Sequence, residues 1–293
     1  MTSLVACVVP AQAALGESPV WSAAEQALYW VDGTAPAVFR YTPGDGSNAR
    51  LPWRLPSPVG CIVPRREFGL LLGLGDGLYV PPAASGSPSK FCDLGVGWPG
   101  NRLNDGKADR AGRLWIGSIH AAETAPTGHL YQVVADGSWR RADSGFICSN
   151  GLDWSLDDRT LYFADSGTRT IFVYDVDPAT GAIGSRRVFA TLAGDDGAPD
   201  GLVLDEDGYL WCACWDGWQI LRYAPDGRID RRITMPVQRP TSLAFGGADY
   251  RTLFVTSARM DLTESELTRG PLAGSVFAFS PGVAGRAPFE FAG

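Results

Sequence analysis

The sequence predicts an all-β protein, a six-bladed β-propeller that forms a single domain over residues 1–293. Glycine, proline and aromatic residues are abundant, as expected for many short strands joined by tight turns. A chain of 293 residues, 45% of them apolar, can bury a sizeable core. A hairpin-like pattern also recurs along the chain, which indicates a repeat array.

The repeat is clearest at residues 150–166, where a short strand, an Asp-rich turn and an aromatic-bearing strand follow one another. Six copies align on equivalent leucines, spaced 43 to 49 residues apart, at positions 28, 71, 114, 161, 210 and 253. Each copy precedes a further strand-like segment. A period of this length with three or four strands per unit is typical of a propeller blade. We expect few helices.

The final blade needs one more strand. Residues 4–9 are β-prone and precede the first complete copy, so we expect them to pair into the last blade. Residues 288–291 could compete for the same edge.

The first residues of the innermost strands converge on one mouth of a propeller's central channel. In the six copies these residues are Glu17, Gly60, Asn104, Asn150, Asp200 and Thr241. Four of them carry a carboxylate or carboxamide, and such groups are costly to bury without a partner. A bound cation would resolve this conflict, so the pattern predicts a metal site at that mouth. The alternative is that Asn-Gly and Asp-Gly here only form tight turns.

Oxygen-only ligands suit Ca²⁺, Mg²⁺ or Mn²⁺, and the set contains no His or Cys of the kind found in structural zinc sites.

Four motifs closely resemble the senescence marker protein/regucalcin and gluconolactonase family. They are LGESPVW at 15–21, NRLNDGK at 101–107, SNGLDWS at 149–155 and PDG at 199–201. Residues 246–247, 256–259 and 271–275 resemble that family's last blade. The resemblance covers nearly the whole chain.

The resemblance implies a metal-dependent hydrolysis of a sugar aldonolactone, such as gluconolactone or xylonolactone, to the aldonic acid. It implies Glu17, Asn150 and Asp200 as ligands of one divalent cation, which would be Ca, Zn, Mn, Mg or Fe. It also implies Arg102 and Asn104 as substrate contacts, with Glu123 as a further contact from a loop.

The chemistry agrees with this interpretation. A cation makes a lactone carbonyl more electrophilic and a water more acidic. Asp200 is our candidate for the catalytic carboxylate that accepts the water's proton. The fork of donors on Arg102 would orient sugar hydroxyls or the ring oxygen.

Two other functions stay open. One is a non-enzymatic propeller that binds a divalent cation, and the other is a calcium-dependent hydrolase of phosphotriesters. A Ser-His-Asp hydrolase is disfavoured, because the chain has two histidines and no Gly-x-Ser-x-Gly motif.

The formal net charge of −7 and the lack of basic runs disfavour a nucleic-acid partner. We expect no membrane partner either, because no apolar run has the roughly 20 residues that span a bilayer. Six dispersed cysteines, and an N-terminus without a basic signal-peptide region, favour a cytoplasmic protein. We expect a monomer that binds a small sugar lactone.

Overall fold

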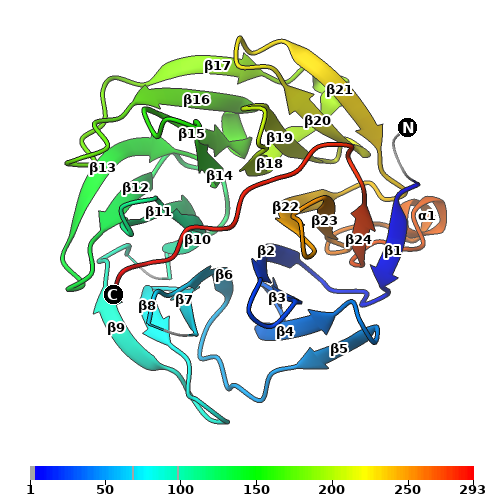
Figure 1. The fold of residues 1–293 in the computed structure, drawn as a ribbon, viewed down its shortest axis with the longest axis horizontal. Helices are drawn as coiled ribbons and strands as arrows, with labels where there is room; N and C mark the ends of the chain where they lie inside the picture. The colour runs from blue at the N-terminus through cyan, green and yellow to red at the C-terminus, as the bar shows by residue number, and fades with distance from the viewer. Residues whose placement is uncertain (1–3, 68, 98) are drawn as a thin grey trace. The chain divides into compact units, whose positions relative to one another are not determined.

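The computed structural model describes residues 4–67, 69–97 and 99–293, which form two compact units. The first unit contains the chain up to Leu51 together with Leu192–Ala287, and the second contains Pro52–Thr191 together with Pro288–Gly293. Each unit holds three four-stranded antiparallel sheets (Figure 1). The six sheets match the six predicted blades.

The first unit contains sheets β2-β3-β4-β5, β18-β19-β20-β21 and β1-β24-β23-β22. The bounds are β1 Ala6–Val9, β2 Gly16–Ser22, β3 Ala27–Asp32, β4 Ala37–Thr42, β5 Ser47–Arg50, β18 Ala198–Leu204, β19 Leu210–Trp215, β20 Gln219–Tyr223, β21 Ile229–Thr234, β22 Pro240–Gly246, β23 Thr252–Ser257 and β24 Val276–Phe279. A 3₁₀ turn, η2 (Gly194–Asp196), precedes β18, and α1 (Glu264–Arg269) lies between β23 and β24.

The second unit contains sheets β6-β7-β8-β9, β10-β11-β12-β13 and β14-β15-β16-β17. The bounds are β6 Val59–Pro64, β7 Leu70–Leu74, β8 Gly77–Val80, β9 Ser89–Asp93, β10 Asn101–Ala108, β11 Leu114–His120, β12 Gly128–Val133, β13 Trp139–Phe146, β14 Ser149–Trp154, β15 Thr160–Asp165, β16 Thr170–Asp175 and β17 Arg187–Thr191. A 3₁₀ turn, η1 (Ser166–Thr168), follows β15.

The predicted repeat is confirmed strand by strand. The six equivalent leucines lie in the second strand of each sheet, and each is at most 1% exposed. Helix is scarce, as expected, since α1 is the one α-helix among the described residues.

The N-terminal strand completes the last sheet. β1 pairs antiparallel with β24, with Ala6 opposite Ala278 and Cys7 opposite Phe277. This confirms the predicted pairing of the segment before the first copy.

The C-terminal segment does not compete for that edge, because it belongs to the second unit. Phe291 forms a bridge with Arg65 and is fully buried in an apolar cluster with residues of β6–β12. Its segment is drawn in red in Figure 1.

The fourth strand of each sheet is more exposed than the first. β14 and β22 are buried at every position, whereas β5, β13 and β21 are mostly exposed. Each unit has its apolar clusters between neighbouring sheets. A first strand covered on both faces can carry polar side chains only where they find partners.

The hairpin turn between β18 and β19 is held by a buried ion pair. Asp205 Oδ1 accepts the backbone N–H of Tyr209 at 2.9 Å, and Oδ2 accepts Nε1 of Trp211 at 2.8 Å. Arg222 reaches the same Oδ2 at 2.7 Å and also pairs with Asp230. The side chains of Asp205 and Arg222 are 0% and 4% exposed. Asp109 makes the equivalent bonds to Arg113 and Trp115 in the second unit.

Among the described residues, no helix has the length and apolar character needed to cross a membrane. The six cysteines all lie within the described residues and form no disulfide.

We predict that Asp205→Ala lowers the free energy of unfolding by about 3–5 kcal/mol, because it leaves the Arg222 guanidinium buried without its central partner. Urea denaturation measures the change. Asp226→Ala is the control, since Asp226 pairs with Arg228 at an exposed turn and should change stability little. Equal effects of the two substitutions would contradict the prediction.

Candidate functional site

The residues predicted to open the inner strands lie at breaks in strand register. In five of the six sheets, two residues of the first strand lie opposite a single residue of the second strand. In the sixth sheet, whose first strand is β6, one extra residue is inserted in that strand. The breaks contain Ser18-Pro19, Gly60, Asn104-Asp105, Asn150-Gly151, Asp200-Gly201 and Thr241-Ser242. Glu17 directly precedes the first of these breaks. A β-bulge bends its strand and re-aims the side chain, and bulges are frequent beside active sites.

The Asn-Gly and Asp-Gly pairs are therefore not hairpin turns, because they lie inside β10, β14 and β18. Glycines at the breaks in register allow inner strands to approach closely. A Cβ on Gly201 would lie 2.3 Å from Ser242 Oγ in β22, and a Cβ on Gly60 would lie 2.6 Å from the Asn104 carbonyl oxygen in β10. The turn-former interpretation of these pairs is wrong.

In the second unit a hydrogen-bonded chain links Arg102 to the strand that carries Asn150. Arg102 Nη1 donates to Asn104 Oδ1 at 2.8 Å, and Asn104 Nδ2 donates to the Ser149 carbonyl at 2.9 Å. Asn150, the next residue, is 7% exposed and donates through Nδ2 to Ser166 Oγ at 3.1 Å. The structure thus brings Arg102, Asn104 and Asn150 onto adjacent strands, β10 and β14.

Glu123 lies apart from this chain, in the exposed loop between β11 and β12. The loop is tied to the start of β10, because Ala121 N donates to the Gly100 carbonyl at 2.9 Å and Thr127 Oγ1 donates to Asn101 Oδ1 at 2.7 Å. Glu123 itself has a left-handed φ of 53°. The loop is placed beside Arg102's strand, and the substrate contact of Glu123 stays a prediction.

In the first unit Glu17 and Asp200 lie on β2 and β18, on either side of β22. Glu17 Oε2 accepts the N–H of Ser18 at 2.9 Å, with Ser18 at a left-handed φ of 47°. Thr241 Oγ1, from the bulge of β22, donates to the Gly16 carbonyl at 2.6 Å. Asp200 is 3% exposed. The side chain of Thr241 thus holds β2 at the residue before Glu17.

The three predicted metal ligands offer only oxygen atoms, which fits a hard divalent cation. Among the described residues, no three His, Cys, Asp or Glu side chains form a cluster that could hold a metal. The predicted set differs from such a cluster because one ligand is the carboxamide of Asn150. The assignment of Glu17, Asn150 and Asp200 to one cation stays a prediction.

Sequence reasoning missed several polar residues near these positions. Lys107 Nζ pairs with Asp153 Oδ2 at 3.1 Å between β10 and β14, and burial raises the pKa of the Asp105 carboxyl. Ser166 begins η1, where Asp165 accepts the N–H of Gly167. The Asp-Ser-Gly-Thr sequence there is a recognisable capping signal. The contact of Ser166 with Asn150 joins η1 to β14, 16 residues apart in the chain, and no local pattern indicates it.

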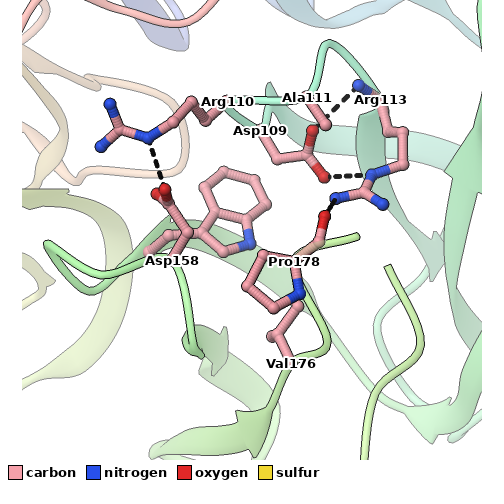
Figure 2. Close-up of a pocket in the computed structure, with 8 residues that line it drawn as sticks. Asp109, Arg110, Ala111, Arg113, Asp158, Val176 and Pro178 are labelled. Carbon is pink, nitrogen blue, oxygen red and sulfur yellow. Dashed lines mark hydrogen bonds and ion pairs between the residues drawn. The ribbon is translucent and has the colours of Figure 1, made fainter. Parts of the chain in front are cut away.

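A pocket of about 220 Å³ in the second unit lies near the other end of β10 and β14, and Figure 2 shows its labelled lining residues. It is lined by Asp109, Arg110, Ala111, Arg113, Trp154, Asp158, Val176 and Pro178. Its charges are paired, Arg113 with Asp109 at 2.6 Å and Arg110 with Asp158. None of the sequence-predicted site residues lines it, so we interpret it as part of the turn network.

We predict that Asp105→Asn gains stability over the wild type as pH rises. Burial raises the pKa of Asp105, so the folded state favours the protonated form. Its stability falls as pH rises above the ordinary pKa of an aspartate, and the loss is complete once pH has passed the raised pKa. The Asp105→Asn variant has no carboxyl at this position, so its stability does not fall for this reason. Urea denaturation at a series of pH values from acid to neutral measures the difference.

Asp136→Asn is the control of opposite sign. Hydrogen bonds from Ser138 lower the pKa of Asp136, so the wild type should gain over this variant as pH rises. A stability difference for Asp105→Asn that does not vary with pH would contradict the prediction.

Comparisons with known proteins agree with the strand pattern and motifs. The family model described as "SMP-30/Gluconolactonase/LRE-like region" matches residues 15–259. The chain is 36% identical to 6-deoxy-6-sulfogluconolactonase of Pseudomonas putida over all of both chains, and 34% identical to regucalcin of Oryctolagus cuniculus over 99% of this chain and 98% of regucalcin. The crystal structure of a calcium-binding protein, regucalcin from Agrobacterium tumefaciens, superposes with a TM-score of 0.91 at 28% identity, over 97% of this chain and 96% of that one. The chain is therefore a six-bladed β-propeller that belongs to the SMP-30/gluconolactonase/LRE-like family.

Proposed function

We propose that this protein is a lactonase that hydrolyses a sugar aldonolactone to the aldonic acid with the help of one divalent cation. The observation that carries the proposal is the chain of hydrogen bonds from Arg102 through Asn104 to the strand of Asn150. It sets a guanidinium and a carboxamide, which can recognise a polyhydroxylated ring, beside a proposed metal ligand. Membership of the gluconolactonase family supports the same reaction.

Glu17, Asn150 and Asp200 would hold the cation, which would be Ca, Zn, Mn, Mg or Fe. When bound, such an ion supplies Lewis-acid polarisation of the lactone carbonyl and acidifies a water. The donor set supports this proposal, because two carboxylates and one carboxamide match the charge and the oxygen preference of hard divalent ions.

The protein's own groups would complete the chemistry. Asp200 would help to hold the cation, and its carboxylate would accept the proton of the attacking water. Arg102 would donate to the ring oxygen or hydroxyls, while Asn104, oriented by Arg102 and the Ser149 carbonyl, would contact the substrate from β10. Glu123 would add a contact from its loop.

A second candidate is cation binding without hydrolysis. The regucalcin from Agrobacterium tumefaciens is described as a calcium-binding protein, which favours this alternative over phosphotriester hydrolysis. The single-domain organisation, the monomeric state and the cytoplasmic location stay predictions from the sequence.

We predict that metal-stripped protein loses lactonase activity and that one or more divalent ions restore it. Proton release is followed in weak buffer with glucono-, xylono-, arabinono- and galactono-lactones, after adding back Ca²⁺, Mg²⁺, Mn²⁺, Zn²⁺ or Fe²⁺. 6-Deoxy-6-sulfogluconolactone is added to the substrates tested, because a relative from Pseudomonas putida is named 6-deoxy-6-sulfogluconolactonase. Enzyme-free blanks correct for spontaneous ring opening.

Tight cation binding without acceleration of any lactone would favour the binding-protein alternative. Hydrolysis of a phosphotriester, without hydrolysis of any lactone, would support a calcium-dependent hydrolase of phosphotriesters.

We predict that Asp200→Asn lowers kcat by about 10²–10⁴-fold, the usual contribution of a general base, while metal binding persists at higher ion concentration. Lactone hydrolysis is measured at saturating metal, with binding followed separately by calorimetry. Asp226→Asn, at an exposed turn, is the matched control. Wild-type turnover by metal-loaded Asp200→Asn would exclude the base role.

A further inference from the structure

Ser166 lies against the side chain of Asn150 at the bulge of β14. Asn150 Nδ2 donates to Ser166 Oγ at 3.1 Å, and the carboxamide is otherwise well covered, with the residue 7% exposed. Only Asn150 lies in a strand, because Ser166 belongs to the 3₁₀ turn η1. Asn150 lies near the start of β14, and Ser166 follows the end of β15.

Ser166 is held in place by its own backbone and by the turn that it begins. Its N–H donates to the Cys148 carbonyl at 2.9 Å. The preceding residue, Asp165, is 1% exposed and accepts the N–H of Cys148 at 2.9 Å and that of Gly167 at 3.2 Å. The Ser166 hydroxyl therefore has a defined position relative to Asn150.

A carboxamide has two unlike ends. The nitrogen end carries two donors and the oxygen end accepts, so only the oxygen can bind a cation. Rotation by about 180° exchanges the ends at little change in shape, which is why the surrounding hydrogen bonds decide the orientation. In the structure the Ser166 hydroxyl accepts from Nδ2, so the nitrogen end of the carboxamide faces Ser166 and the oxygen end faces away from it.

We propose that Ser166 is a positioning residue that presents the carboxamide oxygen of Asn150 to the cation. This inference rests on the proposed function, in which Asn150 is a metal ligand. It adds a residue that does not bind the ion itself but determines which end of its ligand does. Partners of this kind typically change metal affinity by about 10–100-fold when removed.

The test is a double-mutant cycle on cation affinity, which needs no substrate. Isothermal titration calorimetry gives the Kd of Ca²⁺ and of Mn²⁺ for metal-stripped wild type, Ser166→Ala, Asn150→Asp and the double variant, and for Asn150→Ala as the variant without a ligand at this position. Ser166→Ala should raise Kd by about tenfold in the wild-type background. It should leave Kd unchanged in the Asn150→Asp background, because a carboxylate has two equivalent oxygens and needs no orientation.

Two controls separate positioning from damage to the turn. Thr168→Ala removes a hydroxyl from the same turn, where Thr168 Oγ1 donates to the Asp165 carbonyl, and should keep wild-type affinity. Ser166→Thr retains the hydroxyl and should also keep wild-type cation affinity. Thermal unfolding establishes that each variant is folded. If Ser166→Ala does not fold, Ser166→Gly replaces it as the variant that lacks the hydroxyl.

Three results would overturn the inference. An equal loss in both backgrounds would mean that Ser166 acts only through the structure of the turn. Unchanged affinity of Ser166→Ala, with affinity lost in Asn150→Ala, would leave Asn150 as a ligand that needs no orientation by Ser166. Unchanged affinity of Asn150→Ala would overturn the proposed metal site together with the inference.

Discussion

The candidate site depends on a break in register near the start of the first strand of every sheet. In a regular strand successive side chains alternate between faces, so a polar residue in a fully buried strand would point into apolar packing. The bulge removes one position from the ladder and re-aims the residues around it. The same backbone position is used differently in each blade. Gly60 allows close strand contact, Thr241 links two strands, and Asn104, Asn150 and Asp200 offer oxygen atoms.

Asn104 and Asn150 are rigidly supported because they lie on strands. Asn104 and Asn150 are held on adjacent inner strands by bonds to Arg102, Ser149 and Ser166, not on loops. Sites built on strands keep their geometry more closely than sites on loops. Glu123 is the exception among the proposed substrate contacts, because it lies in the exposed loop between β11 and β12 and not on a strand.

The two ends of the inner strands serve different purposes within a blade. The bulged end carries the proposed chemistry. The hairpin end carries buried Asp-Arg-Trp networks, at Asp205 with Arg222 and Trp211, that satisfy the turn's backbone donors. A strand that is stabilised at one end can tolerate polar, irregular structure at the other.

The sequence by itself determined the all-β class, the six repeats, the pairing of the N-terminal strand and the six positions at the inner strands, because apolar periodicity and turn residues are local signals. Family motifs added the proposed roles of Glu17, Arg102 and Asp200. Only the tertiary structure decided that Asn-Gly and Asp-Gly form bulges and not turns, that the C-terminal Phe291 packs beside Arg65, and that Ser166 holds Asn150. These features depend on hydrogen bonds and close contacts between different strands, often far apart in the chain, and no local pattern specifies them.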